Sequence, residues 1–278
     1  MKKWNLIIDV AKCHDCNNCF LACKDEYFDN TYAPYSVAQP RHGHRWMDIL
    51  RTERGQFPKV DVGYLPYPCM HCDDAPCIQN TKGGAVFKRE DGIVLIDPEK
   101  AKGKKEIVGT CPYGVIYWNE EKQVPQKCTF CVHLLEEGWK EPRCVQACPT
   151  GCMAVVHAED TDMEKMKNSE NLEVYHPDYK TKPRIYYKNL YRYTKSFVAG
   201  SVALRDKDEC AEGAKVTLTH ESTKSSQVTT TNNYGDFKFD DLGNNSGNYR
   251  LDIELAGYGK QSKVIELKTS LNVGTIFL

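Results

Sequence analysis

Cysteines dominate the chemistry that this sequence offers. Of its fourteen cysteines, thirteen fall between Cys13 and Cys152. Three groups and one isolated residue contain most of them: Cys13, Cys16, Cys19 and Cys23 (C-x2-C-x2-C-x3-C); Cys69, Cys72 and Cys77 (C-x2-C-x4-C); Cys128, Cys131, Cys144 and Cys148; and Cys111 in "TCPYG". Proline follows both Cys111 and Cys148. Thiolates at such spacings bind iron-sulfur cubanes, and the fourth cysteine of such a run ligates a second cluster.

Crossed ligation assigns these cysteines to clusters if the outer groups exchange their fourth ligand with each other and the inner groups do the same. The predicted sets are Cys13, Cys16, Cys19 and Cys148 (set 1); Cys128, Cys131, Cys144 and Cys23 (set 2); and Cys69, Cys72, Cys77 and Cys111 (set 3). A fourth cluster would need cysteines at the positions of Thr81, Ala101, Lys104 and Ile107. All four absent thiolates belong to one cubane, so the sequence predicts three 4Fe-4S clusters.

Other uses of cysteine compete with this interpretation. Paired C-x2-C sequences also build tetrahedral zinc sites, although such sites seldom place four cysteines within eleven residues. Disulfides require an oxidising compartment, and the opening "MKKWNLIIDV" has no apolar signal-peptide core and no twin arginine. We therefore expect a cytoplasmic protein in which Cys152 and Cys210 are small, inert thiols.

Three histidines lie inside the cysteine groups, namely His14, His71 and His133. We expect them at the surface or behind the ligands, with tuning of a cluster potential or proton transfer as the alternative. Lys104, at an absent ligand position, could fill the vacated site with charge or face solvent.

Short elements must position the cysteine groups. "WNLIIDVAKC" predicts a strand entering the first cysteine loop, "GIVLIDPEKA" a strand and turn, and "VIYWNEEKQVPQKC" a strand or hairpin. Short helices are expected after Cys19 and after Cys148. Residues 25–68 form an insertion too long for an ordinary loop, and we expect it to carry structure of its own. The pattern predicts an α+β fold with a double ferredoxin-like domain over residues 1–195.

The segment that follows, residues 155–195, is predicted to connect two domains, with a short helix near residues 163–168. Its aromatic and basic part, "KPRIYYKNLYRYTKSF", is expected to pack on the first domain or on a partner. Stacking on nucleic acid is the alternative, but the net charge of -1 does not support a nucleic-acid surface.

From about residue 196 the sequence becomes rich in Thr and Val, with short alternating runs separated by Gly and Asn turns. Seven such runs include "AKVTLTH", "DFKFDDL" and "NYRLDIELAGY". They predict a small all-β sandwich over residues 196–278. The stretch resembles the immunoglobulin-like module of carboxypeptidase regulatory domains, which implies a scaffold and no chemistry. With 41% hydrophobic residues, a mean hydropathy of -0.58 and no run of about twenty apolar residues, no direct membrane span is expected.

The first domain resembles the iron-sulfur subunits of the dimethyl sulfoxide reductase family of molybdenum or tungsten enzymes. The stretches that carry the resemblance include "IDVAKCHDCNNCF", "PCMHCDDAPC", "TCPYGV", "QKCTFC" and "KPRIYYKNLYR". Subunits of this family normally hold four clusters, and a version with three clusters and a sandwich domain is similar to the small subunits of phenolic transhydroxylases.

This resemblance implies a heterodimer. A large catalytic partner would bind bis-molybdopterin guanine dinucleotide, with molybdenum or tungsten, and a hydroxylated aromatic substrate, as in conversion of pyrogallol to phloroglucinol. The present chain would contain no catalytic residue and would transfer electrons through its clusters. A subunit of a resorcinol hydroxylase or catechol dehydroxylase would look alike, and a structural subunit whose clusters only stabilise the fold is the alternative of a different class.

Overall fold

The computed structural model describes residues 1–278 and divides them into two compact units. Unit 1 comprises residues 1–50 and 64–190, and unit 2 comprises residues 51–63 and 191–278. The boundary expected between residues 195 and 196 thus lies a few residues after the structural one. Residues 51–63, which we expected to belong to the first domain, group with the second unit instead.

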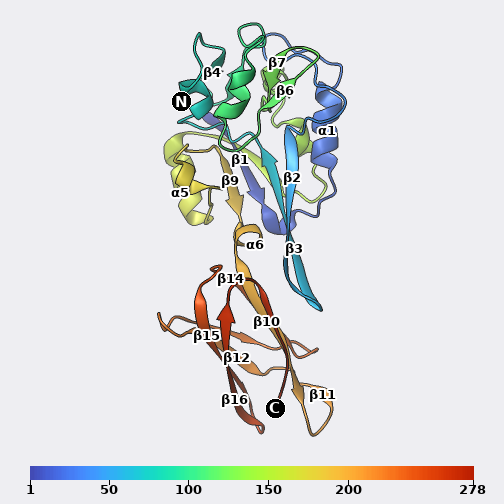
Figure 1. Ribbon diagram of the computed structural model, residues 1–278, viewed down its shortest axis with the longest axis vertical. Helices are drawn as coiled ribbons and strands as arrows, with labels where there is room; N and C mark the ends of the chain where they lie inside the picture. The colour runs from blue at the N-terminus through green and yellow to red at the C-terminus, as the bar shows by residue number, and fades with distance from the viewer. The chain divides into compact units, whose positions relative to one another are not determined.

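Unit 1 is built from short elements (Figure 1). Its strands are β1 (Lys3–Asp9), β4 (Val86–Lys88), β5 (Val94–Ile96), β6 (Tyr117–Asn119), β7 (Val124–Gln126), β8 (Met153–Ala158) and β9 (Ile185–Lys188), with parts of β2 (Met47–Gln56) and β3 (Lys59–Pro68). Its α-helices are α1 (Asn18–Tyr27), α2 (Pro76–Gln79), α3 (Val132–Glu136), α4 (Arg143–Gln146) and α5 (Asp160–Ser169). Three 3-10 turns complete it: η1 (Val10–Lys12), η2 (Lys105–Thr110) and η3 (Pro177–Tyr179). No helix of the structure is both long and apolar enough to cross a membrane.

The three-stranded sheet of unit 1 has the order β8-β1-β9. Strand β1 runs antiparallel to β8, with Ile8 opposite Met153, and parallel to β9. On one face of the sheet, Ile7 is buried in a small apolar cluster with Met163 of α5 and Leu172. This sheet fixes the ends of the strands that lead into the first cysteine group and out of the last.

Three hairpins, β2–β3, β4–β5 and β6–β7, supply the remaining strands of this part of the chain. They confirm the expected hairpin before Cys128, the strand in "GIVLIDPEKA" and the structured insertion. Helix α5 confirms the expected short helix near residues 163–168.

The prediction of a helix after Cys148 is wrong. The short helix α4 ends before this residue, and the chain then turns through Gly151, with φ +61°, into β8. Pro149 disfavours a helical conformation at Cys148, and glycine readily adopts the left-handed conformation of the turn.

Unit 2 contains two sheets. The first has the order β13-β12-β15-β16, and in the second β10 pairs with β11, β14 and β17. Its elements are β10 (Ser196–Leu204), β11 (Glu209–Cys210), β12 (Lys215–His220), β13 (Ser226–Thr230), β14 (Asp236–Leu242), β15 (Gly247–Leu255), β16 (Gly259–Leu267), β17 (Leu271–Phe277) and the short helix α6 (Tyr191–Thr194). All seven runs named from the sequence are strands, and only the two-residue β11 was not expected.

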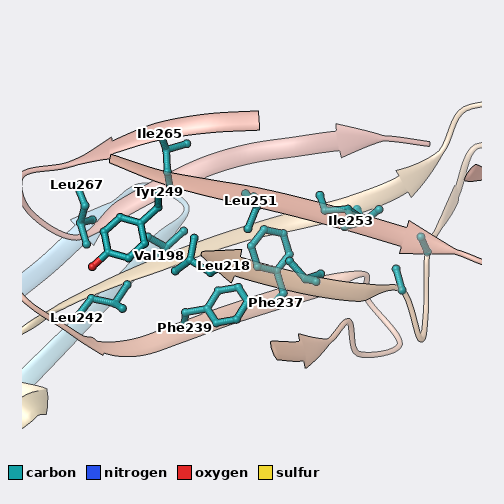
Figure 2. Packing of buried hydrophobic residues seen from close by; sticks show 14 of the residues in the cluster. Val198, Leu218, Phe237, Phe239, Leu242, Tyr249, Leu251, Ile253, Ile265 and Leu267 are labelled. Carbon is teal, nitrogen blue, oxygen red and sulfur yellow. The ribbon is translucent and has the colours of Figure 1, made fainter. Parts of the chain in front are cut away.

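Apolar side chains from both sheets form the core of unit 2 (Figure 2). They alternate along their strands, as in Leu251 and Ile253 of β15 and Phe237 and Phe239 of β14. Because successive residues of a strand point to opposite faces, this period of two buries one face of each sheet and leaves the other to solvent.

The tip of the β2–β3 hairpin, residues 51–63, is part of unit 2. Asp61 accepts hydrogen bonds from Arg54, Arg192 and Lys238 at 2.8, 3.2 and 2.9 Å. The Gln56 side chain bonds two backbone groups, the carbonyl of Ser270 at 3.0 Å and the N–H of Asn272 at 2.9 Å. The insertion therefore supplies polar contacts to unit 2 as well as strands to unit 1.

Candidate iron-sulfur sites

The first cysteine group follows β1 and sits on a loop and a helix. Cys13 comes at the end of η1, and α1 carries Cys19 and Cys23. Between them, Asp15 and Asn17 adopt left-handed conformations with φ of +56° and +61°. Asp and Asn tolerate this conformation better than most residues, so the loop can turn tightly enough to bring its thiols together.

The second and third groups also alternate tight turns with single helical turns. His71 lies between Cys69 and Cys72 with φ +44°, and Cys77 follows Pro76 in the first turn of α2. Proline suits a first helical turn because its missing N–H would have no partner there. Cys111 follows η2, Cys131 precedes α3 with φ +50°, and Cys144 lies in α4.

Helices pair in the way that crossed ligation requires. Helix α1 of the first group packs against α4 of the third, and α2 of the second group packs against η2, which leads to Cys111. The first cysteine group thus lies beside the third, and the second lies beside the turn that leads to Cys111.

The thiols of each predicted set also act on one another electrostatically. Burial, together with the neighbouring thiolates of Cys13, Cys16 and Cys148, raises the pKa of Cys19 to about 12. Burial likewise raises the pKa of Cys72 to about 12, with smaller contributions from Cys69, Cys111 and Cys77. In the remaining set the pKa of Cys144 is raised far above its usual value, first by burial and then by Cys131, Cys128 and Cys23.

Each of the three sets thus has a member whose pKa responds to the other three. Effects between sets are also present: Cys19 raises the pKa of Cys144 slightly, and Cys69 raises that of Cys128 more than Cys131 does, so neighbouring sets lie near one another. A raised pKa keeps a free thiol protonated at neutral pH, whereas metal ligation requires the thiolate. Cluster assembly must therefore displace these protons.

A small cavity lies at set 2. Its walls are apolar apart from the thiols, and they comprise Leu6, Cys23, Tyr27, Met47, Pro68, Cys128, Phe130, Cys131, Pro142 and Cys144. No three Cys, His, Asp or Glu side chains in the structure converge closely enough to hold a single metal ion. Four thiols spread around an apolar cavity suit a multi-atom cluster better than the single tetrahedral ion of a zinc site.

Side-chain donors approach one thiol in each set. The phenol of Tyr27 is 2.6 Å from the hydroxyl of Thr129 and lies near Cys131, whose pKa it lowers. The hydroxyl of Thr181 is 2.7 Å from the phenol of Tyr113 and lies near Cys72, whose pKa it lowers.

In set 1, Cys148 has two side-chain neighbours. The Thr150 hydroxyl and the Cys152 thiol each lie 3.5 Å from its sulfur. The sequence did not indicate the roles of Tyr27 and Thr181, because each is far from its cysteine along the chain and lies in no cysteine group.

The histidines inside the cysteine groups differ in environment. His71 is buried, and its Nδ1 accepts a hydrogen bond of 3.0 Å from the Val94 N–H. Its proton is therefore on Nε2, which has no hydrogen-bond partner within the chain. Burial, followed by repulsion from Lys127, lowers the pKa of His71.

His133 is also buried, and its Nε2 lies 2.9 Å from Glu26, whereas His14 is exposed. A buried N–H without an acceptor is costly, and a sulfur-rich cluster beside His71 would supply one. The donor set, the cavity and this N–H all fit iron-sulfur clusters.

Other side chains stand at the positions where a fourth cluster would need cysteines. Ala101 and Ile107 are buried in the apolar interior, with exposures of 0% and 1%. Lys104 is half-buried, and its ammonium lies 3.4 Å from the carbonyl oxygen of Lys82. Side chains therefore occupy much of the space that a fourth cubane would need.

Comparisons with known proteins agree with this geometry. Residues 60–158 match the family model of the 4Fe-4S dicluster domain, and residues 198–275 match that of the carboxypeptidase regulatory-like domain. The second match agrees with the immunoglobulin-like resemblance of unit 2.

Similar proteins extend the match to the entire chain. The pyrogallol hydroxytransferase small subunit of Pelobacter acidigallici is 49% identical over 100% of both chains. The arsenate respiratory reductase iron-sulfur subunit ArrB of a Shewanella species is 29% identical over 66% of this chain and 94% of its own. A tetrathionate reductase subunit of Salmonella typhimurium is 30% identical over 68% of this chain and 73% of its own. The chain therefore belongs to the family of iron-sulfur electron-transfer subunits that includes the pyrogallol hydroxytransferase small subunit.

Proposed function

We propose that the chain holds three 4Fe-4S clusters and relays electrons for a large catalytic partner that binds a molybdopterin cofactor. The ligands would be the three predicted sets: Cys13, Cys16, Cys19 and Cys148; Cys128, Cys131, Cys144 and Cys23; and Cys69, Cys72, Cys77 and Cys111. The observation that carries the proposal is the packing of α1 against α4 and of α2 against η2, with the four thiols of set 2 around one cavity. When bound, each cluster supplies a site that accepts and releases one electron.

The arrangement of unit 1 around these sets would be a double ferredoxin-like fold. Two observations support it, namely the antiparallel pairing of β1 with β8 and the packing of α1 against α4 and of α2 against η2. The strand pairing and the α1–α4 packing relate the first cysteine group to the third, and the α2–η2 packing relates the second to Cys111, as crossed ligation requires.

The residues of this chain would set how readily each site takes up an electron. The hydroxyls of Tyr27 and Thr181 lie near Cys131 and Cys72 and lower the pKa of these thiols. Hydrogen bonds to ligand sulfur, net charge and solvent exposure govern the potential of a cluster. Cys16 is the one exposed thiol of the twelve, so a partner can approach set 1 more closely than the other two sets.

The catalytic partner determines the net reaction of the complex. Because the Pelobacter small subunit is 49% identical over its full length, we infer a transhydroxylase-like complex acting on hydroxylated aromatics such as pyrogallol. A transhydroxylation has no net redox change, whereas a hydroxylase or dehydroxylase must pass electrons through the clusters in every turnover.

The first experiment is a metal and sulfide analysis of the anaerobically purified complex. About twelve irons and twelve acid-labile sulfides per chain are expected for three cubanes, with one molybdenum or tungsten per complex. About sixteen irons would show that other ligands complete a fourth site, and zinc in place of iron would overturn the proposal.

A second measurement tests the relay itself. Electron paramagnetic resonance of the dithionite-reduced complex should show cluster signals that change when an aromatic substrate is added together with an electron acceptor. Signals that never respond to the partner's substrate or to an external donor would leave the clusters a structural role only.

A further inference from the structure

One buried thiol lies against the ligands of set 1 without belonging to any set. Cys152 is 4% exposed, and its sulfur lies 3.5 Å from that of Cys148. The thiol of Cys13 is also near, since it contributes to the raised pKa of Cys152. Cys152 thus lies beside two of the four predicted ligands of one cluster, one from each end of unit 1's sequence.

The backbone holds Cys152 firmly in this position. Its carbonyl accepts a hydrogen bond of 2.7 Å from the N–H of Asp9, which extends the β1–β8 ladder by one step. Because β1 leads into Cys13 and Cys152 leads into β8, the sheet fixes the distance of this thiol from both neighbours.

The direction of the hydrogen bonds follows from the chemistry of the ligands. When Cys13 and Cys148 bind iron they are thiolates and carry no proton, so only Cys152 can donate at these contacts. A cysteine that binds no metal is a thiol at neutral pH and carries the hydrogen that this donation needs.

We infer that Cys152 is a positioning residue: a protonated thiol that does not ligate iron, donates hydrogen bonds to the thiolates of Cys13 and Cys148, and raises the reduction potential of cluster 1. Hydrogen bonds to ligand sulfur stabilise the reduced cluster more than the oxidised one, because the reduced cluster carries more negative charge. Thr150, whose hydroxyl lies 3.5 Å from the Cys148 sulfur, adds to the effect.

This inference rests on the proposed function, since it requires a cluster at set 1. The test uses the intact complex with three variants: Cys152→Ala, which removes the donor; Cys152→Ser, which keeps a donor; and Cys210→Ala. The last is the matched control, because Cys210 is an exposed thiol of unit 2. Iron content and a potentiometric titration followed by electron paramagnetic resonance are measured for each.

We expect Cys152→Ala to keep the iron content of the wild type and to lower the potential of one cluster. The expected change is about threefold to tenfold in the one-electron equilibrium constant, and tenfold corresponds to 59 mV. Cys152→Ser should restore part of the shift, and Cys210→Ala should show none. An exchangeable proton coupled to the cluster should disappear in Cys152→Ala.

Two results would overturn the inference. A loss of about four irons per chain in Cys152→Ala, with the serine variant also depleted, would make Cys152 a ligand. Unchanged potentials in an iron-replete Cys152→Ala complex would show that the thiol has no influence on the cluster. Wild-type protein without iron would instead contradict the proposed function itself, so the two failures are distinguishable.

Discussion

At the scale of residues, the cysteines of this chain share a common environment of burial and mutual repulsion. Burial, together with Cys69 and Cys131, raises the pKa of Cys128 to about 12. Such thiols stay protonated at neutral pH unless a cation stabilises the thiolate. Nearby hydroxyls and the thiol of Cys152 then give each set of ligands different polar neighbours.

Replacing one ligand should remove one cluster. We expect Cys128→Ser to lower the iron content from about twelve to about eight per chain, because serine is a poor ligand for a soft iron-sulfur site. Elemental analysis and the number of spins in the reduced state would measure this loss. Cys210→Ser, at an exposed thiol, is the control and should keep all the iron; equal iron in both variants would contradict the assignment of Cys128.

At the scale of elements, the β2–β3 hairpin is the feature that sequence reasoning placed least well. Its tip belongs to unit 2, where Asp61 bonds three cations. Arg54, one of the three, is nearly buried, with 6% of its side chain exposed. The nearly buried Arg54 guanidinium needs the Asp61 carboxylate beside it, since an uncompensated buried charge is costly.

Removing the Asp61 carboxylate should therefore loosen the hairpin tip. We expect Asp61→Asn to destabilise residues 51–63 by about 1–3 kcal/mol, seen as faster amide hydrogen exchange in peptides from this segment. Exchange in the β8-β1-β9 sheet should stay unchanged. Asp206→Asn, at an exposed turn of the same unit, should leave exchange at the wild-type level; if Asp61→Asn did the same, the three ion pairs would contribute no stability.

Two glycines of unit 2 allow the cost of a left-handed backbone to be compared with the cost of a steric clash. Gly235 and Gly213 have nearly equal φ, +73° and +74°. A Cβ on Gly235 would lie 2.2 Å from the carbonyl oxygen of Val202, whereas a Cβ on Gly213 would meet nothing within 4 Å.

We expect Gly213→Ala to cost about 1–2 kcal/mol from its left-handed conformation and Gly235→Ala to cost roughly 1–3 kcal/mol more, because β10 must shift. Hydrogen exchange of residues 196–242 in the full chain would measure both. Equal protection in the two variants would show that β10 adjusts without cost.

At the scale of the whole molecule, the two units differ in what their interiors contain. Unit 2 has an apolar core formed by both of its sheets, whereas unit 1 combines buried apolar residues such as Trp46 and Leu95 with the twelve thiols of the predicted sets. Binding that requires the folded state stabilises that state, so the clusters should contribute to the stability of unit 1 alone.

Removing iron should therefore affect the units unequally. After anaerobic chelation, we expect faster hydrogen exchange in α1, α2 and α4, which carry Cys19, Cys77 and Cys144, while β12 and β15 of unit 2 keep their protection. Reconstitution with iron and sulfide should reverse the change, and zinc should not. Uniform loss of protection along the chain would contradict separate stabilisation.

The sequence by itself determined the chemistry and the class of each domain. Cysteine spacing within a group is a local property, and it correctly indicated iron-sulfur chemistry; the three sets and the absent fourth stay a prediction. The period of two in the last eighty residues is equally local, and it correctly predicted the seven longer strands of the sandwich.

Only the tertiary structure decided what depends on contacts between distant residues. It assigned the tip of an insertion to unit 2 through the ion pairs of Asp61, which no local pattern encodes. It also brought Tyr27, Thr181 and Cys152 to the ligand sulfurs. Hydroxyls and thiols of this kind are common throughout the chain, and only three-dimensional packing determines which of them faces a ligand.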